Sequence, residues 1–389
     1  MPGFTDSEPS PSDPATVADL ESSETDPTVD EIAHVEDERN ILREFVEGLG
    51  FTEIKNGQWF PKLLAISVSS YAKKVDAKYF QDKYAGVPAD AIVDQRIKMA
   101  ARYAAIEGGL SATAYTGAIA ATIGSLGGAS PATVPAAVAT VMVDIAYISQ
   151  LQLRLAYDIA VLYRVPLDVD DPDDLWKLIR VAFTIKSGEA VREGAIKAVP
   201  VLMRPLIKRF YAGPVLAAAK SLPVVGKFLL QRNLIKIGIP LVGIPLAVVL
   251  NRWTTAVAGR HARAIFRNEA RVLETAERLV ERSRHPQMLL WVAWFVVKAD
   301  DKVSDDEALL LRHLTRIAHE RHEIVDDRLA GVVDIDPEDV WSLVAAAKDD
   351  LDDIVGASVV IAEIDGEVNP RERLVLEEIR ARSVEDQAA

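Results

Sequence analysis

A run of 36 residues without a charged side chain, from Gly108 to Val143, places the strongest limit on how this chain folds. By length alone, such a run is long enough for one or two membrane-spanning helices. Its composition is mainly Ala, Gly, Ser and Thr, with few of the large apolar residues that drive insertion into lipid. The sequence GGASP divides the run into two segments. We therefore expect a packed helical hairpin inside a soluble or peripheral domain, with a hairpin that enters lipid as the alternative.

The rest of the chain predicts an all-α fold. No segment shows the period-two alternation of a half-buried strand, whereas helical periodicity recurs along the sequence. The first helix is expected from about residue 28, a second helical run from about Trp59 to Tyr84, and a third from about Asp90. The apolar stripe predicted for the first helix consists of Ile32, Val35, Ile41, Leu42 and Val46.

The distribution of charge divides the chain into three parts. Residues 1–38 contain twelve acidic and no basic residues, although the net charge of the whole chain is only −14. Residues 175–268 contain sixteen Lys and Arg and two Glu, whereas residues 299–389 contain twenty-five acidic and ten basic residues. We expect a disordered acidic leader (1–30), a basic helical domain (31–268) and an acidic helical domain (269–389). A basic middle between acidic ends suggests an anionic partner for the middle, or intramolecular docking of the acidic domain on it.

Two absences bound the class of protein. The chain has no cysteine, which excludes disulfides, thiolate catalysis and Cys-ligated zinc. Its N-terminus has neither the basic start nor the apolar core of a secretory signal, so we expect a cytoplasmic protein. The sequence HERHE, His319 to Glu323, spaces its histidines three apart rather than the four of a zinc-protease helix. With no catalytic constellation recognised, the prediction is a non-enzyme. A hydrolase whose catalytic carboxylates the sequence alone does not pair is a weaker alternative.

The pattern Asp-x-x-Val-(Ser/Asn)-x-x-Glu occurs twice, about 65 positions apart. Ser304 with Glu307, and Asn369 with Glu372, each fit a capping box, in which the first side chain accepts from the helix backbone and the Glu reaches back. Pro370 occupies the first helical position, where its missing donor costs nothing. Both motifs are therefore predicted helix starts.

The aspartates of the two motifs suggest a second interpretation. Asp300 and Asp365 each lie four residues before a cap, at the expected end of the preceding helix, where a carboxylate is disfavoured. Together with Glu307 and Glu372 they offer oxygen ligands to a hard cation such as Ca²⁺ or Mg²⁺. The spacing does not match an EF-hand. Two interpretations stay open: the motifs only start helices, or they start helices and also bind a cation.

Charged residues in the middle of the chain give two further predictions. Arg154 and Asp158, spaced i,i+4 on an apolar helix, are predicted to form a partly buried ion pair that fixes helix register, with a binding role as the alternative. Basic residues interleaved with Val, Leu and Ile between residues 181 and 238 predict amphipathic helices on an anionic membrane surface. Pairing with acidic protein segments competes with this interpretation, and specific nucleic-acid binding is disfavoured because stacking aromatics are sparse. The predicted surface cations are Lys197, Arg204, Lys208, Arg209, Lys220, Lys227, Arg232 and Lys236.

Residues 51–267 resemble the EcsC family. The resemblance rests on the Gly-rich uncharged run, the helix ending LAYDIAVLYRVPLDVDDPDDL, the basic stretch, and the late segment IPLVGIPLAVVLNRWTTAVAGRHARAIF. The family takes its name from a bacterial operon that encodes an ABC transporter. Members commonly have Tyr-Gly at the helix end where this chain has Tyr163 and Arg164. The resemblance implies the fold more than a mechanism.

Residues 286–382 resemble the TerB-like domain, an all-α module first noted in tellurite-resistance operons. The segments AWFVVKADDKVSDDEALLLRHLTRIA and ASVVIAEIDGEVNPRERLVLEEIRAR carry this resemblance, with Asp301 where the family often has Gly. It implies metal-linked stress sensing and scaffolding at the inner membrane face. We therefore expect a peripheral membrane scaffold or stress sensor whose acidic module binds a divalent cation or a partner protein. The alternative is an accessory subunit of a membrane transporter or secretion system, with a lipid-inserted hairpin and no metal role.

Overall fold

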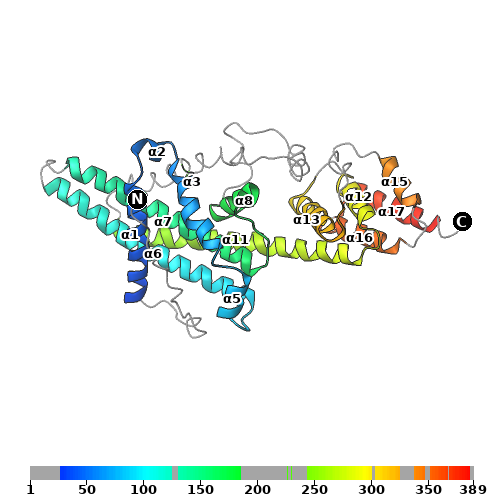
Figure 1. Cartoon of the computed structure of the whole chain (residues 1–389), viewed down its shortest axis with the longest axis horizontal. Coiled ribbons are helices and arrows are strands. Elements are labelled where there is room, and N and C mark those ends of the chain that lie inside the picture. Colours follow the sequence, from blue (N-terminus) through cyan, green and yellow to red (C-terminus); the bar gives the residue numbers. More distant parts are fainter. Residues whose placement is uncertain are drawn as a thin grey trace.

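A computed structural model of the chain describes residues 27–124, 130–184, 226, 229, 243–299, 303–324, 337–346, 351–366 and 368–385. Within these ranges every regular element is a helix, as predicted. The molecule is elongated, and its two halves share one long helix (Figure 1). The predicted leader lies outside the described residues up to residue 26, and the first helix begins at Val29.

The N-terminal lobe is built from helices that precede and surround the hairpin. A capping box between Thr28 and Glu31 starts α1, and Asp76 and Asp171 cap α5 and α8 with their carboxylates. A single π-helical turn, η2, interrupts the run between α3 and α4. The bounds are α1 (Val29–Glu47), α2 (Phe51–Lys55), α3 (Trp59–Leu64), η2 (Ala65–Ser69), α4 (Ser70–Ala72), α5 (Ala77–Lys83), α6 (Ala89–Gly124), α7 (Ser130–Leu162) and α8 (Pro172–Ala182).

The uncharged run forms a helical hairpin. Helix α6 ends at Gly124 and α7 begins at Ser130, so the helices flank the predicted break at GGASP. The two helices pack against each other and extend to one end of the molecule (Figure 1). Within the described ranges, none of the helices combines the length and the apolar character that crossing a membrane requires.

The C-terminal lobe contains the two predicted helix starts. Its helices are α12 (Pro286–Val297), α13 (Asp305–His322), α15 (Pro337–Ala346), α16 (Asp352–Ala362) and α17 (Pro370–Glu385). Helix α12 is apolar from Met288 to Val297 and buried there except at Phe295, because α13, α15, α16 and α17 all pack against it. It is therefore the central helix of this lobe.

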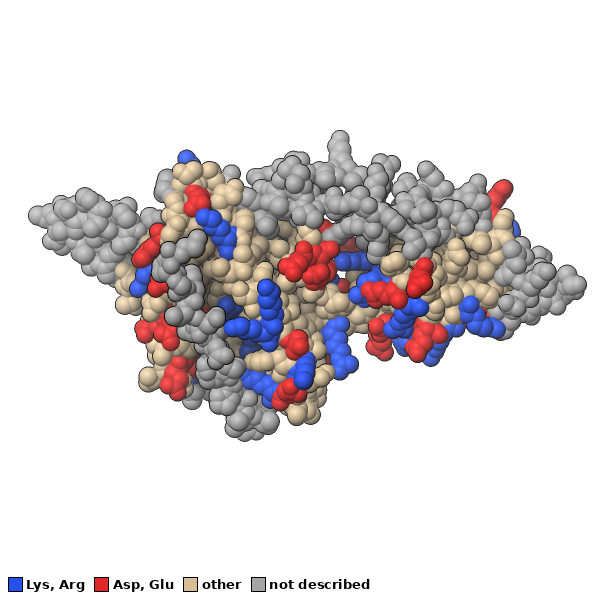
Figure 2. Space-filling view, viewed as in Figure 1, with Lys and Arg blue, Asp and Glu red and all other residues tan. Residues whose placement is uncertain are grey.

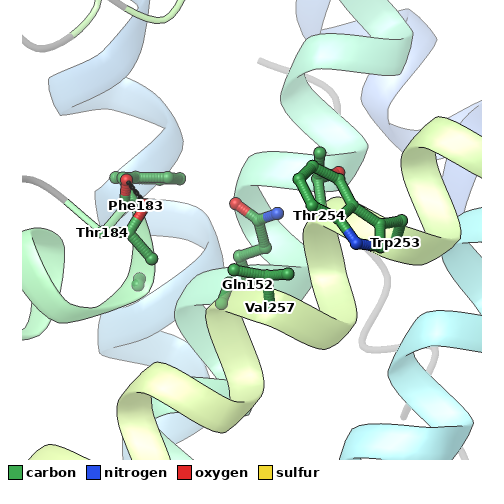
Figure 3. Close-up of a pocket in the computed structure, with 8 residues that line it drawn as sticks. Gln152, Phe183, Thr184, Trp253, Thr254 and Val257 are labelled. Carbon is green, nitrogen blue, oxygen red and sulfur yellow. Dashed lines mark hydrogen bonds between the residues drawn. The ribbon is translucent and has the colours of Figure 1, made fainter.

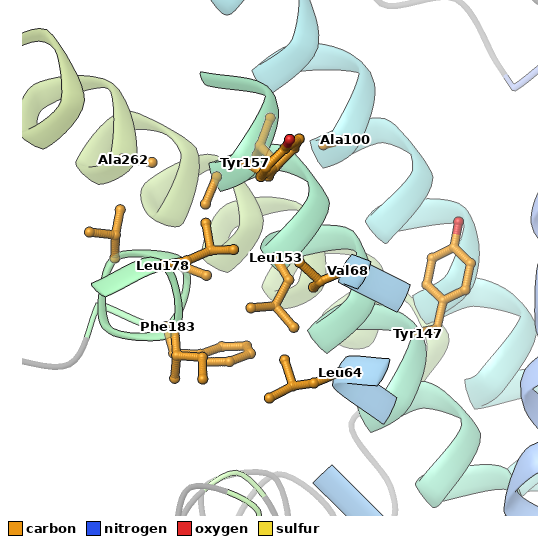
Figure 4. Packing of buried hydrophobic residues seen from close by; sticks show 14 of the residues in the cluster. Leu64, Val68, Ala100, Tyr147, Leu153, Tyr157, Leu178, Phe183 and Ala262 are labelled. Atoms are coloured by element: carbon orange, nitrogen blue, oxygen red, sulfur yellow. The ribbon is translucent and has the colours of Figure 1, made fainter. Parts of the chain in front are cut away.

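Helix α11 (Gly243–Arg282) joins the lobes without interruption. At 1.5 Å per residue, its 40 residues span roughly 60 Å. Its first part packs in the N-terminal core, where Ala262 belongs to the same buried cluster as Leu153, Leu178 and Phe183 (Figure 4). From Val272 onward its buried residues belong to a second hydrophobic cluster. The domain boundary predicted between residues 268 and 269 thus falls inside a continuous helix, close to the point where one cluster gives way to the other.

The prediction that an apolar stripe of α1 is buried was correct in part. Val35, Leu42 and Val46 are buried, but Ile41 is 64% exposed. Arg39 takes a buried position instead, because its guanidinium pairs with Glu107 of α6 at 2.8 Å.

Candidate functional site

The two capping boxes of the C-terminal lobe are formed as predicted. Ser304 accepts a hydrogen bond from the backbone N–H of Glu307 at 3.2 Å, and the Glu307 carboxylate accepts from the Ser304 N–H at 2.7 Å. At the second motif, Asn369 Oδ1 accepts from the Glu372 N–H and the Glu372 carboxylate accepts from the Asn369 N–H, both at 3.0 Å. These bonds satisfy backbone donors that would otherwise have no partner at the helix starts.

The fold brings the two motifs together, although 65 positions separate them. Burial raises the pKa of Glu307 above its ordinary value, the hydrogen bonds from Ser304 oppose that rise, and the negative charges of Asp365 and Glu372 add to it. Glu307 and Glu372 are both buried, whereas Asp365 is exposed on the turn between α16 and α17. Gly366 follows Asp365 with φ of 92°, a left-handed conformation that glycine adopts without strain.

A cationic side chain on α11 links the two motifs, and no local sequence pattern indicated it. Arg271 donates to Asp306 of the first motif at 2.9 Å and to the backbone carbonyl of Ile364, just before Asp365, at 3.2 Å. Asn268, one helical turn earlier, donates to the same Asp306 carboxylate at 2.6 Å. The paired motifs are therefore fastened to α11 by side chains that lie more than 30 residues away in sequence.

The predicted cation ligands are only partly assembled in the described residues. Asp300 lies outside them, so the structure places Glu307, Asp365 and Glu372 alone. Of the residues that the structure describes, no three Asp, Glu or His side chains are grouped as a metal ion would need. Each buried glutamate also gives one oxygen to its cap, which leaves the exposed Asp365 as the accessible carboxylate of the set.

The predicted ion pair between Arg154 and Asp158 was wrong, because each side chain has a different partner. Arg154 donates to Glu38 of α1 at 2.7 Å and to the carbonyl of Ser67, within the π-helical turn, at 3.3 Å. Asp158 is fully buried and accepts from Tyr71 at 2.8 Å and from Arg96 of α6 at 2.9 Å. The two charges connect α7 to four neighbouring elements, α1, η2, α4 and α6, and do not fix the register of α7 itself.

The basic surface predicted for the middle of the chain lies outside the described residues. This applies to Lys197, Arg204, Lys208, Arg209, Lys220, Lys227, Arg232 and Lys236. On the face of the molecule that Figure 2 shows, acidic and basic side chains of the described residues are interspersed on both lobes. His319 and His322 are both exposed on α13, as expected for a solvated helix face.

A small pocket opens where α7, α8 and α11 meet. Its volume is about 80 Å³, and Gln152, Thr184 and Trp253 line it from these three directions (Figure 3). Sites for drug-sized ligands usually have roughly 300 Å³ or more. The pocket is therefore large enough for a few water molecules or one small side chain.

Comparison with known proteins adds no assignment: no protein-family model matches the chain, and no significant match appears among curated proteins or solved structures.

Proposed function

We propose that this protein is a non-enzymatic scaffold or stress sensor at the inner face of a membrane, with an EcsC-like N-terminal lobe and a TerB-like C-terminal lobe. The observation that supports the proposal best is α11, which is one continuous helix within both hydrophobic cores. A helix that belongs to two cores joins the lobes and limits how far each can turn relative to the other. A ligand or surface that orients one lobe therefore orients the other as well.

The two ends of the molecule suit different partners. The N-terminal lobe carries the uncharged hairpin and is continuous with the basic segment, which together fit an anionic lipid surface. The C-terminal lobe presents Asp365 next to two further carboxylates whose charges act on one another. A divalent cation, or a basic side chain of a partner protein, would reduce that repulsion. We infer that this lobe is the part that binds the partner or cation.

Membrane binding is tested by flotation of the full chain with vesicles. We expect binding to vesicles that contain phosphatidylserine, weak binding to neutral phosphatidylcholine vesicles, and release by high salt. Replacing Lys208 and Arg209 with Gln should weaken binding several-fold. The control is the same replacement of Lys73 and Lys74, an exposed adjacent pair on the N-terminal lobe. Equal binding to neutral vesicles would contradict the surface mechanism, and resistance to salt and carbonate would favour the lipid-inserted alternative.

Cation binding is tested separately by calorimetric titration of Ca²⁺ and Mg²⁺ into the full chain. We expect saturable binding that Asp365→Asn weakens about tenfold, because this change removes the accessible charge of the cluster. Glu363→Gln, at an exposed neighbouring position, is the control. If no cation binds, the two motifs are helix starts only, and the scaffold would use protein partners at this end.

A further inference from the structure

A buried charged cluster lies at the junction between the lobes, on three different helices. Glu269 of α11 accepts a hydrogen bond from Lys177 of α8, in the N-terminal lobe. The same carboxylate oxygen lies 3.5 Å from Nε2 of His313, on α13 in the C-terminal lobe. Glu269 and His313 are almost completely buried, and Lys177 is mostly buried. One carboxylate thus connects the helices of both lobes that meet at α11.

A second contact holds the same two helices together. Arg312, which precedes His313 on α13, donates to Asp174 of α8 at 2.8 Å. Asp174 and Lys177 lie one turn apart on α8. Asp174 contacts Arg312 directly, and Lys177 is linked to the next residue of α13, His313, through Glu269. Figure 1 shows α8 and α13 on the same side of α11. Polar contacts between side chains therefore supply much of the docking of α13 near α8.

His313 is the member of this cluster whose polar atoms are least well satisfied by hydrogen bonds. Its ring nitrogens make no hydrogen bond of good geometry within the described part of the chain, and the long 3.5 Å contact of Nε2 with Glu269 is the polar contact nearest to one. The charged groups that face it are Glu269 from α11, Lys177 from α8, and Arg316 from its own helix. Helix α12, which also packs against α13, has no titratable side chain between Pro286 and Val297. Three cations would therefore surround one carboxylate if His313 became protonated.

We propose that this cluster is an acid-sensitive latch between the lobes, in which protonation of His313 loosens the docking of α13 against α8 and α11. Glu269 is neutralised by Lys177 while His313 is uncharged, and the nearby Asp174 is already paired with Arg312, so a second buried cation has no carboxylate of its own. The added charge is buried in a low-dielectric site, where its desolvation is costly. The lobes then remain joined by α11 but lose the contacts across their junction.

The direction of the pH effect follows from the titrations. Burial lowers the pKa of His313 below its ordinary 6.5, with Arg316 and Lys177 adding to the effect and Glu269 opposing it. The docked state therefore binds the proton less readily than the undocked state. The latch is fully closed above pH 6.5 and weakens as the pH falls below it. The pKa of Glu269 itself is below its ordinary 4.5, because the neighbouring His313 and Lys177 outweigh its burial, so Glu269 stays charged above that pH.

The test uses the absence of cysteine, since two introduced thiols become the only labelling sites. Spin labels at Lys73→Cys and Glu377→Cys, both exposed positions on different lobes, report the distance between lobes by pulsed electron resonance. We expect a narrow distance distribution at about pH 8 that broadens between about pH 6.5 and pH 5. His313→Gln should remove this broadening, whereas His322→Gln, an exposed position on the same helix, should leave it unchanged.

A second variant separates the latch from a general loss of packing. In Lys177→Met, the protonated His313 would be the cation nearest to Glu269, so acid should narrow the distribution instead of broadening it. The proposal is overturned if the unmodified junction shows no change down to about pH 5, or if His313→Gln broadens like the parent chain. Acid broadening that persists in Lys177→Met would also overturn it.

Discussion

Arg164, two residues after the end of α7, adopts a backbone conformation that favours glycine. Its φ is 57°, in the left-handed region, and its side chain is exposed. Non-glycine residues are strained there, and glycine is the usual residue at this position after a helix. We expect Arg164→Gly to raise the free energy of unfolding by about 1 kcal/mol, measured by urea denaturation.

The control for this prediction is Lys73→Gly. Lys73 also follows a helical segment and is exposed, but its φ is −70°, which any residue adopts. Glycine at that position should only add flexibility to the unfolded chain and lower stability by up to about 1 kcal/mol. A loss of stability in Arg164→Gly as well would show that the Arg164 side chain makes a contribution larger than its backbone strain.

Single residues also show which interactions a sequence can reveal. The capping boxes at Ser304 and Asn369 were predicted because both partners lie three positions apart on the same helix start. The pairing of Arg154 with Asp158 was wrong, because partners from α1 and α6 compete for both charges and no local pattern records them. The same reason explains why Arg271, which links the two motifs, was not recognised.

At the scale of elements, the close contact between α6 and α11 depends on a glycine. A β-carbon at Gly108 would lie 2.8 Å from the carbonyl oxygen of Ala247, a backbone atom that has no room to move alone. We expect Gly108→Ala to lower the free energy of unfolding by about 1–3 kcal/mol through overpacking. Gly356→Ala is the control, because a β-carbon at that position would have no neighbour within 4 Å and alanine favours the helix by up to about 1 kcal/mol. Thermal unfolding of both variants checks that stability falls in Gly108→Ala and rises in Gly356→Ala.

The charges that bracket the hairpin meet at its base. Burial and the charge of Asp144 raise the pKa of Glu107 to about 8, against the opposing effects of Arg39 and Ser111. The folded chain then holds a proton that the unfolded chain has already released above pH 4.5. Stability from this site is full at low pH and is lost as the pH rises toward 8.

The prediction for Glu107 concerns the slope of stability against pH. Between about pH 5.5 and pH 8 we expect the free energy of unfolding to fall by up to about 1.4 kcal/mol per pH unit from this site. Glu107→Gln should flatten the slope, and Glu36→Gln, at an exposed position on α1, should not change it. A chain whose stability rises over this range, with the same rise in Glu107→Gln, would show that Glu107 is ionised in the fold. Urea denaturation at several pH values gives the slopes.

Helices were predicted correctly where the sequence pattern that indicates them extends over many consecutive residues. The uncharged run with its Gly-rich break predicted the hairpin, and Ala89 begins α6 one residue before the expected start. The π-helical turn Ala65–Ser69 was missed, because it depends on tertiary contacts: Arg154 binds the carbonyl of Ser67 there. Charge composition likewise predicted an acidic C-terminal domain but not the interspersed surface that Figure 2 shows.

For the whole molecule, the charge pattern predicted a boundary between residues 268 and 269, but it did not indicate how the two hydrophobic clusters near that boundary are joined. A boundary between charge blocks suggests a linker, whereas the structure has a helix that passes from one core into the next. The helical periodicity of α11 continues across the boundary. At this point the charge composition therefore suggests a linker, whereas the periodicity indicates a continuous helix. The continuous helix determines how strongly a change in the orientation of one lobe alters the orientation of the other lobe.

This coupling can be tested by a break in α11 between the clusters. Ala270 packs at the edge of the first cluster and Val272 begins the second, so a proline at residue 270 falls at the point where the cores separate. Proline removes the N–H that a helix uses and clashes with the carbonyl of Phe266, at a cost of about 3 kcal/mol. Because each lobe keeps its own core, Ala270→Pro should retain most of its helical circular dichroism while X-ray scattering shows a wider range of overall shapes. Ala270→Gly keeps the hydrogen bond and should retain the shape of the parent chain. Loss of helix content in one entire lobe of Ala270→Pro would mean instead that α11 is a shared part of a single cooperative core, and that the lobes do not fold independently.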